Sequence, residues 1–207
     1  MRIITLVLGP VRTNCYLLIN EDTKETIIID PADNALAIKN KIKSEELTPV
    51  AILLTHGHFD HIMAAKEVAD EYDILIHAFH EEWELLGDVK LNAGYLVRSD
   101  VTLTPHKALK DQEIVNMAGM KLQVIHTPGH TRGSVCFYHE ESQNLISGDT
   151  LFLESVGRTD LPTGSSDTLN HSLYDILFKL PDATKVYPGH GEDTTIGHEK
   201  MSTELWS

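Results

Sequence analysis

The sequence predicts an α/β (α+β) protein in which two strand-rich halves form sheets that pack under helices. Two observations support this class: short apolar runs rich in β-branched residues recur in both halves, and stretches with helical spacing lie between them. At about 150 residues per domain, the 207-residue chain is expected to form a single domain over residues 1–207. Apolar residues make up 42% and charged residues 23% of the chain, which is the usage of an ordinary folded protein.

The apolar pattern predicts the elements of the first half. Asp30-Pro31 ends the third strand, because proline cannot donate a hydrogen bond to a neighbouring strand. Apolar residues between 36 and 42 recur at helical spacing, and residues 50–54 are continuously apolar, as in a strand buried on both faces. We expect strands at 3–8, 15–19, 26–29, 50–54 and 74–76, and helices at 34–46 and 62–72.

The second half continues with short strands and one long helix. Residues 81–100 mix polar and aromatic side chains and predict a helix plus a loop. The helix at 169–180 can be capped by Ser165, Ser166 or Asp167, because the side-chain oxygens of these residues accept hydrogen bonds from free amides. We expect strands at 101–103, 113–115, 121–125, 134–138, 144–147 and 185–187.

The charge balance and the apolar pattern argue against several classes of protein. With 17 basic and 31 acidic residues, the net charge of −14 repels nucleic acid and anionic lipid at long range. No apolar run approaches the ~20 residues that cross a bilayer, and residues 1–8 suit a first strand better than a signal peptide. Cys15 and Cys136 are expected to be buried, reduced thiols. We therefore expect a cytoplasmic protein without nucleic-acid or membrane partners.

Residues of the metal-binding types gather just after the strand predicted at 50–54. The chain has 12 histidines, and His56, His58, Asp60 and His61 lie within six residues. Side chains two positions apart in extended backbone point the same way, which pairs His56 with His58, and a following helix would present Asp60 and His61 from its first turn. Zn²⁺ accepts imidazole nitrogen and carboxylate oxygen at about 2.0–2.2 Å. The segment predicts a metal site, against the alternative of a histidine-rich surface loop.

Three residues farther along the chain share this setting. His130, Asp149 and His190 each follow an apolar strand and a glycine. Glycine permits the tight turns that place the next side chain at the rim of a sheet, where ligand sites gather. Singly, each residue is more typical of an ordinary loop. We expect the remaining histidines to be structural or exposed: His77, His80, His106, His126, His139, His171 and His198.

The combined motifs resemble the metallo-β-lactamase fold superfamily. The motifs are THGHFDH at 55–61, TPGHT at 127–131, Gly148-Asp149 and PGHG at 188–191. Within that superfamily, GRTD at 157–160 and GEDTTIGHEK at 191–200 are similar to the hydroxyacylglutathione hydrolase, or glyoxalase II-like, branch. The resemblance extends from residue 14 to about residue 200. It implies a four-layer αββα metallo-β-lactamase sandwich with metals at one edge of the two sheets.

The resemblance also implies a ligand set of seven residues and two divalent metal ions. We expect zinc by default, with iron or manganese as alternatives that the same ligands accept. One ion would bind His56, His58 and His130, the other would bind Asp60, His61 and His190, and Asp149 would bridge both. Asp60 and Asp149 would then be the catalytic carboxylates.

Three more residues match supporting positions of the family. Asp30 matches an aspartate that orients a metal-binding histidine, with a strand-terminating turn residue as the alternative. Arg158 and Asp160 would brace the loops of the site by a charge-assisted contact, and an exposed surface pair is the alternative.

The implied site predicts hydrolysis of a thioester. Two divalent ions about 3.5–4 Å apart lower the pKa of a water molecule to near 7, so that a bridging hydroxide can attack a carbonyl carbon. A thiolate, with an unperturbed pKa near 8.5, departs without a proton donor, whereas an amine needs one. No further motif supplies such a donor. S-lactoylglutathione or a related small acyl thioester is therefore the expected small-molecule substrate.

The chain departs from classical glyoxalase II after the last motif. Only 17 residues follow His190, where the classical enzyme has a helical extension that holds much of the glutathione. Residues 81–100 are a candidate for covering part of the site. Trp83 and Tyr95 would then form its wall, although ordinary packing is the more common role of such side chains.

Four alternative functions stay open. A persulfide dioxygenase would use a single iron on His56, His130 and Asp149. A nuclease is disfavoured by the acidic charge. A β-lactamase usually carries cysteine at the position of Asp149 and a secretory signal. A protein that binds metal without turnover would have a closed coordination shell. The oligomeric state is also open.

Overall fold

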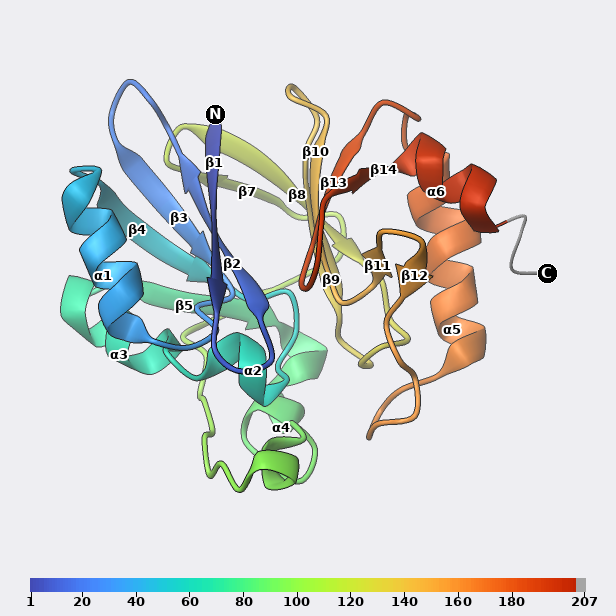
Figure 1. Ribbon diagram of the computed structural model, residues 1–207, viewed down its shortest axis with the longest axis horizontal. Helices are drawn as coiled ribbons and strands as arrows, with labels where there is room; N and C mark the ends of the chain where they lie inside the picture. The colour runs from blue at the N-terminus through green and yellow to red at the C-terminus, as the bar shows by residue number, and fades with distance from the viewer. Residues whose placement is uncertain (204–207) are drawn as a thin grey trace.

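The computed structural model describes residues 1–203, which form two six-stranded sheets with helices on their outer sides (Figure 1). The four-layer αββα sandwich that the resemblance implies is confirmed. The first sheet consists of β1 (Arg2–Leu8), β2 (Thr13–Ile19), β3 (Glu25–Ile29), β4 (Thr48–Leu53), β5 (Leu75–Phe79) and β6 (Lys107–Leu109), in that order. The second sheet has the order β14 (Thr194–Thr195), β13 (Lys185–Pro188), β10 (Asn144–Gly148), β9 (Val135–His139), β8 (Met120–His126) and β7 (Ile114–Met117).

The helices cover the outer face of each sheet (Figure 1). The first sheet is covered by α1 (Ala35–Ser44) and α3 (Ala65–Tyr72), and the second by α5 (Ser166–His171) and α6 (Ile196–Thr203). The short helices are α2 (Phe59–Ile62), η1 (His80–Glu82), α4 (Trp83–Leu86) and η2 (Gly94–Val97). A hairpin of β11 (Leu151–Phe152) and β12 (Ser155–Val156) follows β10, and a π turn, η3 (Ser172–Ile176), and a 3₁₀ turn, η4 (Leu177–Lys179), continue α5.

Both faces of the central strands are buried, which accounts for their continuous apolar runs. In β2, Leu17 packs toward the core under α1 and α3, whereas its neighbour Leu18 packs into the core between the two sheets. Phe137 of the second sheet belongs to the same inter-sheet core and is fully buried. A third apolar cluster, which includes Leu173, joins the second sheet to α5 and η4. Three layers of core thus hold the four layers of backbone together.

The strand expected at 101–103 is wrong. These residues are irregular, because the amide of Leu103 donates to the carbonyl of Leu86 and its side chain is buried under the first sheet. The edge strand is instead β6, which pairs in parallel with β5. The short strands β11, β12 and β14 and the helix α6 were not predicted.

The helix expected at 62–72 is interrupted. The amides of Met63 and Ala64 donate to the carbonyls of Ala32 and Pro31 instead of to their own helix, so α2 ends and α3 begins anew. The interruption fixes the four-residue α2 against the end of β3. The other expected helices agree more closely: Asn34 caps α1, and Ser165 caps α5 by accepting from the amide of Thr168.

The two cysteines are buried, as the sequence predicts, and the helices are short. Cys15 and Cys136 are both unpaired and buried. Burial raises the pKa of the Cys136 thiol to about 11, which keeps it protonated at neutral pH. None of the helices in residues 1–203 has both the length and the apolar character needed to cross a lipid bilayer.

Candidate metal centre

All seven residues expected as ligands lie where strands of both sheets end at one edge of the sandwich. His56 and His58 follow β4, and α2 presents Asp60 and His61. From the second sheet, His130 follows β8, Asp149 follows β10 and His190 follows β13. Because β10 and β13 run in parallel, their carboxyl ends meet at the same edge.

The seven side chains form two clusters with Asp149 between them. The ligand atoms of His56, His58 and His130 all lie within 4.8 Å of one another, and so do those of Asp60, His61 and His190. The Asp149 carboxylate reaches both clusters. Its Oδ2 lies 3.5 Å from Nε2 of His130 and 3.5 Å from Nε2 of His190, and its Oδ1 lies 3.3 Å from Nε2 of His61.

Two glycines bring this carboxylate into place. Gly148 has φ +50°, a backbone conformation that residues other than glycine rarely adopt. It turns the chain directly before Asp149. Gly189 matters for space, because a Cβ atom there would lie 2.0 Å from Oδ1 of Asp149. The glycines that precede Asp149 and His190 therefore have a physical role at this edge.

Several buried polar atoms of the clusters have no hydrogen-bond partner in residues 1–203. They are Nε2 of His56, His58 and His61 and Oδ1 of Asp149. Buried polar atoms are almost always paired, and an unpaired group indicates an ion, a water molecule or a chemical role. Five imidazoles and two carboxylates are a donor set that zinc, iron and manganese all accept. The residues present therefore fit a pair of divalent cations.

The carboxylates and two of the imidazoles have the protonation states that a metal binds. Burial lowers the pKa of His56 well below its ordinary value and that of His58 to about 3, so both imidazoles are neutral. Burial raises the pKa of the Asp149 carboxyl, but the charge of His61 and the hydrogen bond from His190 outweigh it and hold the pKa well below its usual range. The pKa of Asp60 is lowered to about 2 against burial, mainly by His61. Metals bind neutral imidazoles and ionised carboxylates. Against burial, Asp149 and Asp60 raise the pKa of His61 well above its ordinary value and that of His190 to about 9, so these two imidazoles lose a proton when a metal binds.

Asp30 supports one histidine of each cluster. Its Oδ2 accepts from Nδ1 of His61 at 2.9 Å and from the hydroxyl of Thr55 at 2.6 Å. Nδ1 of His56 lies 3.1 Å from the same hydroxyl, and because that hydroxyl donates to Asp30, it is free to accept the imidazole proton. In the neutral form of each histidine, these contacts keep the proton on Nδ1 and leave Nε2 available to a metal.

The predicted brace between Arg158 and Asp160 is an exposed pair within one irregular segment. The guanidinium donates two hydrogen bonds of 2.7 Å to the carboxylate, and both side chains are exposed, as in the surface-pair alternative. The segment also contacts His130 through the main-chain carbonyl of Arg158, which accepts from Nδ1 of His130 at 2.8 Å.

A cleft of about 520 Å³ opens onto the two clusters. Residues 81–100 cover part of it, through Ala93, Leu96 and Val97 rather than through Trp83 and Tyr95. Phe152, Val156 and Leu161 line the side toward the second sheet. These side chains make much of the wall of the cleft apolar.

Sequence reasoning missed Glu82, which holds the loop that carries His130. Its carboxylate is buried and accepts from the hydroxyl of Thr131 and from the amide of Gly133, while Oε2 has no partner in the described residues. Burial raises the pKa of Glu82 to about 7. A glutamate in a short polar helix is typical of a solvated face, so nothing in the pattern at 80–86 could have revealed it.

The support from Asp30 predicts weaker metal binding when its charge is removed. In Asp30→Asn, an amide group that donates would face the donors on Thr55 and His61. We expect affinity for Zn²⁺ to fall about 10- to 100-fold, measured by competition with a chromogenic chelator. Asp22→Asn, in an exposed turn, is the matched control. An unchanged dissociation constant for Asp30→Asn would contradict the supporting role.

The contacts of Glu82 predict a separate effect on stability. Glu82→Ala leaves the amide of Gly133 without this acceptor and the hydroxyl of Thr131 with Ser134 as its remaining partner, so the free energy of unfolding should fall by about 1–3 kcal/mol in urea denaturation. Glu82→Gln retains an acceptor and should lose less. The control is Glu81→Ala, because its side chain is exposed. Equal losses for Glu81→Ala and Glu82→Ala would disprove the proposed contact energy.

The sequence is similar to those of proteins named as hydrolases. The pattern of the "Metallo-beta-lactamase superfamily" matches residues 8–190. The "Probable metallo-hydrolase YqgX" of Bacillus subtilis (strain 168) is 41% identical over 191 residues, covering 91% of this chain and 89% of that protein. The "Hydroxyacylglutathione hydrolase GloC" of Haemophilus influenzae is 35% identical over 193 residues, covering 91% of this chain and 90% of that protein.

Solved structures are similar over almost the whole chain. The BLEG-1 B3 metallo-beta-lactamase superposes with a TM-score of 0.93 at 40% identity, covering 97% of both chains. TTHA1623 in a di-iron-bound form superposes with a TM-score of 0.87 at 34% identity, covering 96% of this chain and 98% of that chain. ETHE1 from Myxococcus xanthus superposes with a TM-score of 0.78 at 28% identity, covering 97% of this chain and 82% of that chain. Because the family pattern matches residues 8–190 and a relative is 41% identical over most of its length, this chain belongs to the metallo-beta-lactamase superfamily.

Proposed function

We propose that this metallo-hydrolase is a binuclear thioesterase that acts on S-lactoylglutathione or a related small acyl thioester. The observation that carries the proposal is the Asp149 carboxylate, which reaches both three-residue clusters at once. The similarity to a protein named hydroxyacylglutathione hydrolase supports the thioester in particular.

In this proposal, each cluster supplies the ligands of one cation. His56, His58 and His130 would hold one, Asp60, His61 and His190 would hold the other, and Asp149 would contact both. Zinc is the default, and the di-iron form of TTHA1623 supports iron as an alternative. When bound, such a pair of cations activates a water molecule at neutral pH and neutralises the negative charge that develops on a carbonyl oxygen.

The side chains around the clusters orient and shield the reacting groups. Thr13 donates to Oδ2 of Asp60 at 2.8 Å, which fixes that carboxylate at the edge of the cleft. The carbonyl of Arg158 fixes the ring of His130. Phe152 and Leu161 keep the opposite wall apolar and so strengthen electrostatic contacts in the cleft.

The cleft favours a leaving group that needs no proton. Outside the two clusters and Asp149, the described residues that line it include no lysine, tyrosine, cysteine or glutamate. An amine leaving group needs a proton from such an acid, whereas a thiolate departs as an anion. This supports a thioester over an amide.

A second candidate is a persulfide dioxygenase with a single iron on His56, His130 and Asp149. The similarity to ETHE1 favours it. In this chain the rings of His56 and His130 have centroids 4.8 Å apart, and Asp149 lies beside His130, so the three residues are close enough for one ion. The second cluster around Asp60 has no role in that reaction and favours the hydrolase.

The proposal predicts metal-dependent release of thiol. The purified protein, loaded with Zn²⁺ or Fe²⁺, should release free thiol from S-lactoylglutathione or another small thioester, measured with a thiol reagent. Removal of metal by a chelator should lower the rate at least 100-fold, and adding metal back should restore it, because the cations activate the attacking water.

Two parallel assays separate the other candidates. Oxygen uptake with glutathione persulfide tests the dioxygenase, and cleavage of a chromogenic cephalosporin tests the activity in the name of BLEG-1. A fully metallated protein that cleaves no thioester but is active in either assay would refute the thioesterase proposal.

A further inference from the structure

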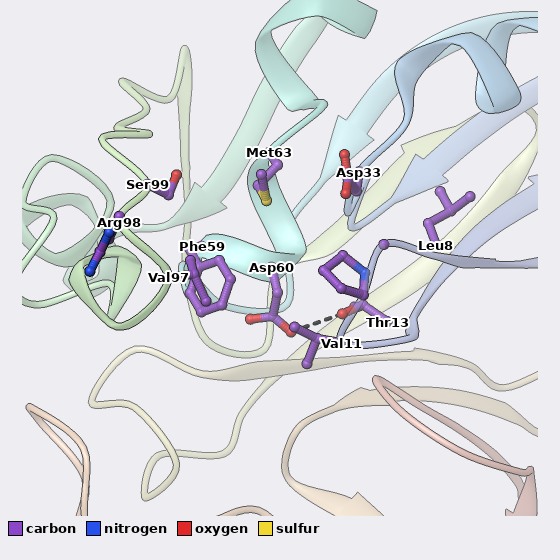
Figure 2. Close-up of a pocket in the computed structure, with 12 residues that line it drawn as sticks. Leu8, Val11, Thr13, Asp33, Phe59, Asp60, Met63, Val97, Arg98 and Ser99 are labelled. Carbon is purple, nitrogen blue, oxygen red and sulfur yellow. Dashed lines mark hydrogen bonds between the residues drawn. The ribbon is translucent and has the colours of Figure 1, made fainter.

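A second pocket adjoins the cleft beside Asp60 (Figure 2). Its volume is about 340 Å³, and it lies between the turn that joins β1 to β2, the helix α2 and the end of η2. Val11, Phe59, Asp60 and Val97 line both this pocket and the cleft. The pocket therefore shares part of its wall with the candidate metal centre.

The lining of this side pocket is mainly apolar. Leu8 and Phe59 are buried at its walls. Val11, Met63 and Val97 are 44, 40 and 49% exposed, although such side chains are usually covered in a folded protein. Three exposed apolar side chains around one hollow favour binding of an apolar group, since isolated exposed residues would be scattered over the surface.

The charged residues that line the side pocket are few and of both signs. Asp33 and Arg98 are the charged residues that line the side pocket apart from Asp60, and they project from different segments (Figure 2). In the cleft, the guanidinium of Arg158 is already paired with Asp160. One arginine in a chain of net charge −14 is a poor match for a ligand with several phosphates.

We infer that the side pocket binds an unbranched alkyl arm of the substrate while its thioester carbonyl lies at the metal centre. The inference rests on the proposed thioesterase function and specifies its substrate class: small thioesters with an apolar arm and no polyphosphate carrier. Either the acyl side or the thiol side of the ester can supply this arm, and its burial removes methylene groups from water.

Chain-length series identify the arm. One series varies the acyl group of N-acetylcysteamine thioesters from acetyl to octanoyl, and the other varies the thiol of acetyl thioesters from ethyl to octyl. We expect kcat/KM of the metal-loaded protein to rise about 2- to 4-fold per added methylene in one series, mainly through KM, until the pocket is filled. Flat profiles in both series would overturn the inference.

A pair of matched variants locates the effect. Met63 lines the side pocket but not the cleft, and Met63→Glu places a carboxylate where the alkyl arm would bury it. The ratio of octanoyl to acetyl activity, or of octyl to ethyl, should fall at least 10-fold. Leu75→Glu, on a side chain that is 43% exposed and lies outside both pockets, should leave this ratio unchanged. Met63→Gln serves as the uncharged second variant, with a smaller fall expected.

A binding measurement distinguishes failure of this inference from failure of the proposed function. Calorimetry with non-hydrolysable S-ethyl to S-octyl thioethers of N-acetylcysteamine should give dissociation constants that fall with chain length, and Met63→Glu should abolish the trend. Chain-length-dependent binding without thioester cleavage would support the pocket and refute the thioesterase. Cleavage of acetyl thioesters without any dependence on chain length would refute the pocket alone.

Discussion

The position of the Asp149 carboxylate between two groups of imidazoles is the constraint on which the rest of the structure depends. A buried carboxylate is unfavourable unless nearby groups compensate its charge. Here His61, His130 and His190 surround it from three segments. Small residues are needed at Gly148 and Gly189 to bring it there. The sandwich thus places the end of β10 where both halves of the chain contribute to one charged centre.

Hydrogen bonds from β2 hold the two halves together at this edge. The side-chain amide of Asn14 donates to the carbonyls of Pro188 and Gly191, and the hydroxyl of Tyr16 donates to Pro188 at 2.6 Å. The main-chain amide of Asn14 also donates to the carbonyl of Gly189. These contacts join an N-terminal strand of the first sheet to the turn that carries His190. Asn14 and Tyr16 therefore fix the turn that carries His190 against the first sheet.

Local parts of the centre could be predicted from the sequence, and non-local parts could not. The spacing of His56, His58, Asp60 and His61 defines a compact cluster, because a strand end and one helical turn separate them. His130, Asp149 and His190 have no local signal beyond a preceding apolar strand and glycine, and only the resemblance to a family joined them to the residues at 56–61. Most strands were predicted because continuous apolar runs reflect burial on both faces.

Three of the errors have a common physical origin in long-range hydrogen bonds. The break between α2 and α3 depends on carbonyls of residues 31 and 32, and the irregular path at 101–103 depends on the carbonyl of Leu86. Glu82 is buried by the loop after His130, which a pattern at 80–86 does not include. Each case involves a partner more than 15 residues away, beyond the reach of any periodicity.

A crystal structure of the metal-loaded protein, with anomalous scattering recorded at the absorption edge of the bound metal, tests the central claim most directly. The account predicts two anomalous peaks on either side of Asp149, one within bonding distance of His56, His58 and His130 and the other within bonding distance of Asp60, His61 and His190. A single peak, or peaks that Asp149 does not touch, would contradict it.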